Sequence, residues 1–333
     1  MQDDFVYLRG FVVPLKGIGV LLPTRETAML GSYDFGPLLD IARQVEDHGF
    51  DSVWVGDSFV ARPRLEPLTL LSSVATATSR ITVGTAALIA STREPVNLAH
   101  SLVTLDHAAS GRLQLAIGTG SPLPVKSEDD AVPMSYNERA GRVDEAVTAW
   151  KQVWSGDDGE LKSNYWDLRG LREQPPPAQA GGPQMWLASG NTPKAVARAG
   201  RYYDGWMPLV PDPADYETGW AAICKAAEEA GRAPDAMTPS MFVTINLTSD
   251  ADRARAELED YTQRYYRLPL GTMSRIMPFF GGSPEDCVRW LGEYVRAGAR
   301  HFVLRMGSFE NGAEHLRLTA EHVLPALRAL QID

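Results

Sequence analysis

The sequence predicts a single (β/α)8 barrel of the TIM type, and three observations lead to this prediction. Apolar, β-rich runs alternate with segments of helical periodicity along the chain, and eight such alternations can be followed. The apolar runs are too uniform for half-exposed strands, which suits parallel strands covered on both faces. The length of 333 residues fits one barrel with insertions. A doubly wound sheet is the alternative architecture, and the number of alternations favours the barrel.

Each expected strand is an apolar run that is followed by a helical segment. The expected strands cover residues 17–23, 50–55, 81–89, 113–117, 185–188, 205–208, 240–247 and 301–305. The expected helices cover residues 38–48, 67–77, 95–105, 136–154, 192–199, 214–230, 252–266, 284–297 and 316–330. The helix at 252–266 is rich in charged residues, so we expect it to face solvent.

One domain is expected to span residues 1–333, and three segments are expected to be insertions in it, after strands 4, 5 and 7. They lie at about residues 121–134, 155–183 and 267–282. The first is polar and contains prolines, which is typical of a long loop over the barrel mouth. The second is rich in Gly and Pro, with three consecutive prolines at 175–177, and the strand–helix order resumes after it. The third is apolar without a clear period. Its residues 278–282 could form a lid that excludes water, and a dimer contact or plain core packing would explain the same residues.

The composition argues against several classes of function. The formal net charge of −10 disfavours nucleic acid and anionic membrane surfaces as partners. No apolar stretch is long enough for a membrane span, and the acidic start Met1–Asp4 does not resemble a secretion signal, so we expect a cytoplasmic protein. Cys224 and Cys287 lie far apart and predict buried thiols. The six histidines do not occur at metal-ligand spacing, so no metal site is predicted.

Residues 80–120 carry the clearest sign of a binding site. Here an apolar strand, a helix that begins at Pro95 and a second strand follow one another. The second strand ends in Gly118, Thr119 and Gly120, and such small residues let a ligand approach the backbone closely. Because residues after the carboxyl ends of barrel strands build the active site, we expect a ligand at this end of the barrel.

Three further strand ends carry candidate site residues, each with a structural alternative. Asp57 follows the second strand, where its carboxylate could face a cofactor or could cap the next segment. Thr192 and Pro193 fit the start of a helix, whose free N–H groups suit a phosphate but also describe an ordinary turn. Arg305 ends the last strand, where it could hold an anionic substrate or the cofactor, or form a structural salt bridge.

The stretch resembles the luciferase-like monooxygenase superfamily, which includes bacterial luciferase and flavin- or deazaflavin-dependent oxidoreductases. The resemblance rests on VGTAALIA at 83–90, on Pro95, on TLDHAASGR at 104–112 and on the Gly-x-Gly strand end. It implies a non-prolyl cis peptide between Ala86 and Ala87, in a bulge that backs the isoalloxazine ring of the cofactor.

The resemblance also assigns residues to the cofactor. It implies a loop that anchors the cofactor phosphate, with a contribution from the end of the fourth strand. It also implies two residues that reach the phosphate or the ribityl chain. One of these, Arg139, could equally form a surface ion pair. The loop residues are Ser189, Gly190, Asn191 and Thr192, the strand residues are Gly118, Thr119 and Gly120, and the reaching residues are Tyr136 and Arg139. Members of the superfamily carry a histidine beside Asp57, where this chain has Ser58. Neither the luciferase reaction nor sugar-phosphate dehydrogenation therefore transfers to it.

The resemblance implies an oxidoreductase, and we expect a monooxygenase that uses reduced FMN and O₂ on a small-molecule substrate, with a separate flavin reductase as a partner. Asp57 and Arg305 are the expected catalytic residues. One alternative is a hydride-transfer oxidoreductase dependent on the deazaflavin coenzyme F-420. A second is a non-catalytic flavin-binding protein. A homodimer is also expected from the resemblance.

Overall fold

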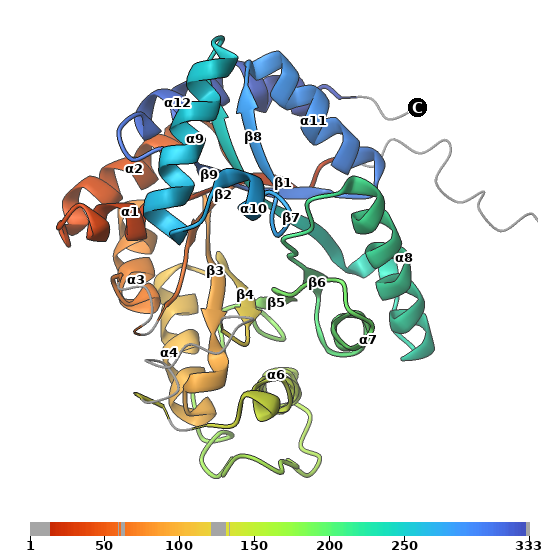
Figure 1. The fold of residues 1–333 in the computed structure, drawn as a ribbon. Coiled ribbons are helices and arrows are strands. Elements are labelled where there is room, and N and C mark those ends of the chain that lie inside the picture. Colours follow the sequence, from red (N-terminus) through yellow and green to blue (C-terminus); the bar gives the residue numbers. More distant parts are fainter. Residues whose placement is uncertain (1–13, 59, 61–63, 121–130, 133, 331–333) are drawn as a thin grey trace, which may run out of the picture.

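The computed structural model describes residues 14–58, 60, 64–120, 131–132 and 134–330, in which a parallel sheet closes into a barrel (Figure 1). Its strands are β1 (Gly17–Leu21), β2 (Ser52–Val55), β3 (Thr82–Ile89), β4 (Leu113–Gly118), β5 (Gln184–Leu187), β6 (Gly205–Trp206), β7 (Thr238–Leu247) and β9 (His301–Met306). Pairing of β6 with β7 closes the ring, and all neighbouring strands are parallel. The predicted (β/α)8 barrel is confirmed.

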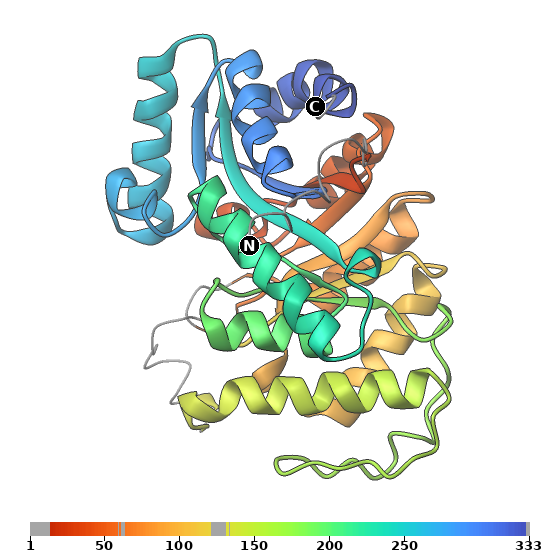
Figure 2. The ribbon, with the colours of Figure 1, turned by 90° about the vertical axis from the view of Figure 1, so that its right-hand side faces the viewer.

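Helices surround the barrel on its outside (Figure 2). They are α1 (Thr24–Met29), α2 (Phe35–Asp47), α3 (Pro67–Ala77), α4 (Pro95–Ala108), α6 (Arg139–Trp154), α7 (Pro193–Tyr202), α8 (Pro213–Glu229), α9 (Ala251–Tyr266), α10 (Leu270–Met273), α11 (Pro284–Arg296), α12 (Gly312–Leu318) and α13 (Leu324–Arg328). A π-helical segment, Thr319–Val323, joins the last two. None of the helices in the described residues is both long and apolar enough to cross a lipid bilayer.

Local capping chemistry explains where the helices begin and end. The Glu94 side chain accepts hydrogen bonds from the N–H groups of Val96 and Asn97, and Pro95 occupies the first position of α4, where its missing N–H costs nothing. At the end of α2, Gly49 has a φ of +79°, the left-handed conformation that a glycine adopts without strain. The predicted helix start at Pro95 is therefore confirmed, and α2 ends at Asp47, one residue before its predicted end at 48.

Two tryptophans fill the interior of the barrel, and glycines on other strands make room for them. Trp54 of β2 and Trp186 of β5 are fully buried, with ring centroids 5.4 Å apart. A Cβ on Gly84 of β3 would lie 2.5 Å from the Trp54 ring, and one on Gly205 of β6 would lie 2.5 Å from the Trp186 ring. His301 of β9 packs edge-on against both rings. The interior is thus a packed core, as is usual for this architecture.

The predicted insertions differ in where they lie. Residues 121–130 and 133 of the first are outside the described residues. The segment 155–183 lies between α6 and β5, ahead of the fifth strand and not after it, on the flank of the molecule beside α6 (Figures 1 and 2). The segment 267–282 contains α10 and a further strand, β8 (Phe279–Gly282), which pairs with the end of β7.

The helix at 252–266 exposes most of its charged residues to solvent as expected, but the expectation missed that its other face is buried. The helix, α9, buries one face, made of Ala254, Leu258, Tyr261, Thr262 and Tyr265. These positions follow helical spacing, so the buried face was encoded in the sequence but was masked by the charged residues on the opposite face. Cys287 is buried as expected, whereas Cys224 is only half-buried.

Candidate functional site

The carboxyl ends of the barrel strands meet at one end of the barrel, which we call the mouth. Below the mouth, one apolar cluster inside the barrel includes residues from every barrel strand or from the residue that follows it. They are Leu21, Trp54, Ala86, Ala87, Ala116, Trp186, Met207, Phe242 and Val303. Met273, Met277 and Phe279 of the segment 267–282 pack against them. The mouth is therefore mostly apolar, and this segment contributes to its lining.

The peptide bond between Ala86 and Ala87 is cis, as the resemblance implied. It lies where the register between β3 and β4 shifts, between Thr85 and Leu88. A Cβ on Gly118, at the end of β4, would lie 3.5 Å from the Ala87 Cβ and 3.8 Å from that of Ala188. Small residues from three neighbouring strand ends thus form a shallow surface that a flat ring could approach closely.

Asp57 bonds to the end of β3, the strand that carries Ala86 and Ala87. Its carboxylate accepts a hydrogen bond of 2.9 Å from the Ile89 N–H at the end of β3, and it also pairs with the Arg93 guanidinium. The Asp57 side chain is only 2% exposed, and Arg93 in turn pairs with Glu66. The Asp57 carboxylate therefore holds the end of β3, whereas the structural alternative considered from the sequence was a cap on the segment that follows Asp57.

Arg139 lies against the glycine end of β4. It is 3% exposed, and a Cβ on Gly120 would lie 3.4 Å from its Nη1. The Arg139 guanidinium also lies 5.2 Å from the centre of the Tyr136 ring, which is half exposed. Gly120 has a φ of +93°, so a side chain there would be strained. The structure thus brings Gly118, Thr119, Gly120, Tyr136 and Arg139 together, and Arg139 is buried and not a surface group.

The loop of residues 189–192 leads into α7 as predicted. The Thr192 hydroxyl accepts from the Ala195 N–H at 3.4 Å, and Pro193 takes the first helical position. No described atom lies within 4 Å of the position that a Cβ on Gly190 would take. An ion pair of 2.6 Å between Arg198 of α7 and Asp144 of α6 fixes the two helices together. Because the loop leads into α7 and Arg139 begins α6, this ion pair also fixes the loop relative to Arg139.

Arg305 lies across the mouth from this group. On β9 it is the next residue after Val303 on the same face of the strand, and its side chain is buried, at 4% exposed. The Nε–H and Nη2–H groups donate to the Thr244 hydroxyl on β7, at 3.0 and 2.6 Å. Aromatic rings surround the guanidinium carbon at 4.9 to 5.5 Å, and they belong to Phe242, Tyr261, Tyr265 and Tyr266.

The electrostatics favour the charged form of Arg305. Burial alone would lower the pKa of its guanidinium, but the tyrosines and the Glu26 carboxylate outweigh burial and raise it. Within the described residues no carboxylate lies within 4 Å of the Arg305 guanidinium, so the salt bridge considered from the sequence does not form there.

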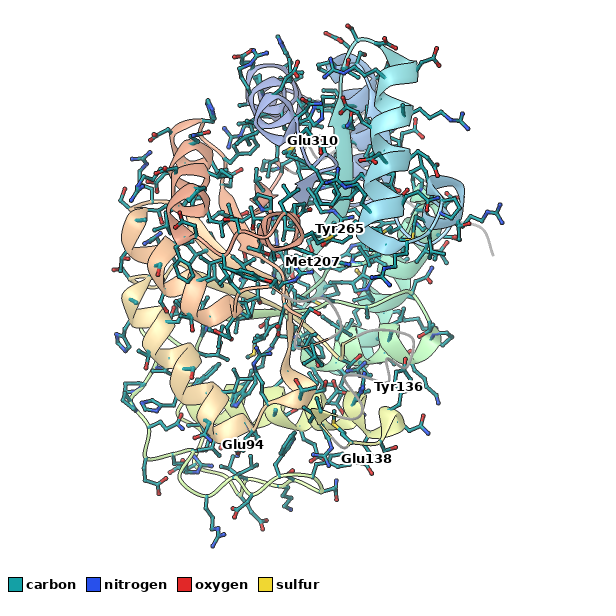
Figure 3. All side chains as sticks on the ribbon, turned by 60° about the vertical axis from the view of Figure 1, so that its left-hand side comes forward. Glu94, Tyr136, Glu138, Met207, Tyr265 and Glu310 are labelled. Atoms are coloured by element: carbon teal, nitrogen blue, oxygen red, sulfur yellow. The ribbon has the colours of Figure 1, made fainter. Side chains whose placement is uncertain are left out.

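Sequence reasoning missed the residues around Arg305. The Tyr261 hydroxyl donates to the buried Glu26 carboxylate at 2.5 Å. Arg64 Nη2 donates a hydrogen bond to the Tyr265 hydroxyl at 3.4 Å, and the Arg25 guanidinium lies 4.0 Å from the centre of the Tyr265 ring. Figure 3 shows Tyr265 and Met207 toward the middle of the molecule, with Glu94 and Glu138 at its edge. The helical spacing of 261 and 265 was the signal that could have found them.

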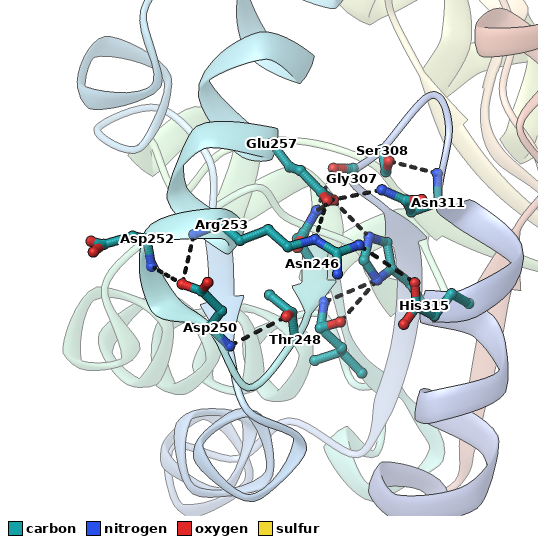
Figure 4. A network of polar contacts seen from close by, with 12 residues as sticks. Asn246, Thr248, Asp250, Asp252, Arg253, Glu257, Gly307, Ser308, Asn311 and His315 are labelled. Carbon is teal, nitrogen blue, oxygen red and sulfur yellow. Dashed lines mark hydrogen bonds and ion pairs between the residues drawn. The ribbon is translucent and has the colours of Figure 1, made fainter.

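A polar network fixes the base of α9, the helix that carries these tyrosines (Figure 4). The Glu257 carboxylate accepts from the side-chain amides of Asn246 and Asn311, both at 2.8 Å, and from Arg253 at 2.9 Å. The ring of His315, fully buried on α12, lies 3.3 Å from the same carboxylate. Burial opposes ionisation of Glu257, but these hydrogen bonds outweigh it and lower the pKa of its carboxyl.

Two hollows in the surface lie away from the inward-facing residues of the mouth. One, of about 500 Å³, is lined by Lys151, Gln184 and Asp204 near the amino end of β5. The other, of about 580 Å³, runs along α3 and α4 and touches Arg93 at one edge. In barrels of this type the chemistry belongs to the carboxyl ends of the strands, so we assign neither hollow to it.

Two known proteins match most of the length of this chain. A phthiodiolone/phenolphthiodiolone dimycocerosates ketoreductase of Mycobacterium tuberculosis is 26% identical over 351 residues, which cover 85% of this chain and 90% of that protein. An F-420-dependent glucose-6-phosphate dehydrogenase of Amycolatopsis mediterranei is also 26% identical, over 89% of this chain and 96% of that protein.

Solved structures share the fold. Monooxygenase RslO1 from Streptomyces bottropensis superposes with a TM-score of 0.77 at 22% identity, over 93% of this chain and 99% of that one. An F-420-dependent secondary alcohol dehydrogenase gives a TM-score of 0.75 at 21% identity, over 95% of this chain and 99% of that one. The sequence itself matches the luciferase-like monooxygenase family over residues 17–301. The chain therefore belongs to the luciferase-like monooxygenase family and is an oxidoreductase enzyme.

Proposed function

We propose that the chain is a hydride-transfer oxidoreductase that uses coenzyme F-420. The observation that carries a ring-shaped cofactor is the surface of small residues at Ala86, Ala87 and Gly118, where the irregular part of β3 meets the glycine end of β4. The choice of F-420 over FMN follows the relatives that match in sequence, because the curated ones named above are a ketoreductase and an F-420-dependent dehydrogenase.

The residues present fit such a cofactor at both of its ends. Ala86 and Ala87 would support the ring, while Arg139, Thr119 and the loop of residues 189–192 would hold the phosphate. Thr192 uses its hydroxyl on the Ala195 N–H, and Pro193 has no N–H, which leaves the Lys194 N–H as a donor of the first turn of α7 for an anion. When bound, F-420 would supply a two-electron hydride carrier, whereas reduced FMN would supply oxygen activation.

The side chains of the mouth would position the reactants and exclude water. The apolar lining around Met207, Phe242 and Met273 offers few groups that could order water beside the ring. Asp57 acts in this proposal as a positioning residue, since it holds the end of β3 through Ile89 and Arg93. Arg305 is the buried charged group that could contact a substrate.

Monooxygenation with reduced FMN is the second candidate, and the same apolar lining favours it because oxygen chemistry on a flavin needs a dry site. It would involve a separate flavin reductase. For either candidate a homodimer stays a proposal, which sedimentation of the purified protein against the monomer mass of 36.5 kDa would test.

A parallel titration with F-420 and FMN, oxidised and reduced, followed by fluorescence, would decide between the two. We expect F-420 to bind at least about tenfold more tightly than FMN, a difference of about 1.4 kcal/mol. Tighter binding of reduced FMN, with slow reoxidation in air, would favour the monooxygenase instead. Binding of neither cofactor would contradict both.

A further inference from the structure

Arg305 presents hydrogen-bond donors that no described protein group uses. A guanidinium has five N–H donors in one plane. Its Nε–H and one Nη2–H donate to Thr244 Oγ1, at 3.0 and 2.6 Å. The other Nη2–H and both Nη1–H groups have no acceptor among the residues that the structure describes. These include the parallel pair at the end of the guanidinium, which can bind both oxygens of a carboxylate.

The charge around Arg305 is not balanced by a direct partner. Glu26 is the buried carboxylate of this group, and it receives the Tyr261 hydroxyl at 2.5 Å. Arg64 adds a second guanidinium, which donates to the Tyr265 hydroxyl at 3.4 Å and, like Arg305, has no carboxylate within 4 Å in the described part of the chain. Glu26 stabilises the charged form of Arg305, but the guanidiniums of Arg305 and Arg64 together carry more positive charge than its single carboxylate balances, which favours a site that receives a negatively charged group.

The surroundings of the guanidinium suit an apolar, flat body. The ring of Phe242 lies 5.3 Å from the Arg305 guanidinium carbon, and that of Tyr265 lies 4.9 Å from it. Met207, Met273 and Met277 continue the same lining, and methionine side chains adapt to the shape of what they contact. A ligand bound here would therefore have one anionic end in an otherwise apolar, aromatic environment.

Arg64 connects this region to the surface of small residues on β3. A Cβ on Gly56 would lie 2.2 Å from Arg64 Nη1 and 3.5 Å from the Ala86 carbonyl oxygen. The same guanidinium reaches Tyr265. A ligand anchored at Arg305 would therefore extend from the β7–β9 side of the mouth toward Ala86, where the ring of the cofactor is proposed to lie.

We propose that Arg305 binds the carboxylate of a substrate whose remaining body is apolar and aromatic. Thr244 is a positioning residue that holds one edge of the guanidinium and leaves the end pair free. That this ligand is the substrate rests on the proposed function. That an aromatic carboxylate binds at Arg305 does not depend on it.

Calorimetry with 2-naphthoate and the neutral 2-naphthamide tests the proposal on the protein loaded with its tighter cofactor and on the protein without one. We expect the wild type to bind naphthoate at least about tenfold more tightly than naphthamide. Arg305→Met should bring the ratio close to one with naphthamide binding unchanged, and Arg305→Lys should restore part of it. The matched control is Arg264→Met, because Arg264 also lies over an aromatic ring, that of Phe309 at 3.8 Å, but outside the mouth on an ion-paired, part-exposed side chain.

Several outcomes would overturn the inference. Equal binding of the two probes by the wild type would do so, and so would a preference that survives Arg305→Met. A loss of cofactor affinity in Arg305→Met, with the naphthoate preference intact, would make Arg305 a cofactor residue instead. If Arg305→Met does not fold, Thr244→Val retains the charge and should lower the preference severalfold, whereas an unchanged preference in both Thr244→Val and Arg305→Lys would contradict the proposal. Failure of cofactor binding together with an Arg305-dependent preference would overturn the proposed function and leave the carboxylate site standing.

Discussion

Gly84 illustrates how closely the barrel interior is filled. A methyl group at this position would lie 2.5 Å from a ring carbon of Trp54, which is enclosed and cannot move aside. We expect Gly84→Ala to lower the free energy of unfolding by about 1 to 3 kcal/mol, the usual cost of overpacking a core. Urea unfolding would measure it, with Gly190→Ala as the matched control. A Gly84→Ala protein as stable as the wild type would show that the tryptophan packs more loosely than the structure indicates.

Gly190 is the opposite case, because the space around it is open. A leucine there meets no described atom within 4 Å of its Cβ, so Gly190→Leu should change stability by no more than about 0.5 kcal/mol. It should nevertheless weaken cofactor binding about tenfold or more, because the side chain would occupy the phosphate loop. Fluorescence titration with F-420 and FMN would measure this. Gly312→Leu, at an equally open position on α12, should leave both affinities unchanged. Unchanged affinity in Gly190→Leu would remove the phosphate-loop assignment.

At the scale of elements, α9 depends on the network around Glu257. The pKa of the Glu257 carboxyl is lowered in the folded protein. The network therefore stabilises the fold fully above the usual pKa range of a carboxyl, and this stabilisation is lost as the pH falls through the pKa of folded Glu257. We expect Glu257→Gln to lower the free energy of unfolding by about 1 to 2 kcal/mol at neutral pH, with the difference shrinking in acid. Urea unfolding from pH 7 to pH 3 would follow it. Glu314→Gln, which removes a more exposed partner of the same Arg253, should have a smaller effect. A difference that is constant with pH would show that the carboxylate charge is not what holds the helix.

The helix α9 also shows what pattern analysis captured and what it missed. The predicted limits, 252–266, differ from the observed Ala251–Tyr266 by one residue, but the buried face of the helix was missed. Charged residues dominate the composition of the helix, while the buried positions 254, 258, 261 and 265 form a narrow stripe. The short strand β8 was missed for a related reason, since four residues added to the edge of β7 carry too little alternation to be recognised.

At the scale of the whole molecule, the barrel followed from local signals, whereas the group around Arg305 did not. Strand and helix periods are properties of neighbouring residues, and the cis peptide was implied by the family resemblance that the residues 83–90 carry. The contact between Tyr261 and Glu26 joins residues 235 positions apart, and that between Arg64 and Tyr265 spans 201. Such contacts depend on how the whole ring of strands closes. Arg305 itself could be predicted because it ends a strand, but its tyrosines could not.

The response of the whole fold to acid follows from two buried histidines. Burial, helped by Lys16, lowers the pKa of His301 from 6.5 to about 3, and burial also lowers that of His315 despite Glu257. Below about pH 6.5 the unfolded chain takes up protons that the folded chain refuses, so stability falls as the pH falls. In this range each histidine lowers the free energy of unfolding by up to about 1.4 kcal/mol for each unit that the pH falls. We expect His301→Gln, which can still accept from Ser52, to flatten the decline between pH 6.5 and pH 4 in urea unfolding. His100→Gln, at an exposed position, should not change it. An equal slope in the wild type and His301→Gln would mean that His301 is protonated inside the folded barrel.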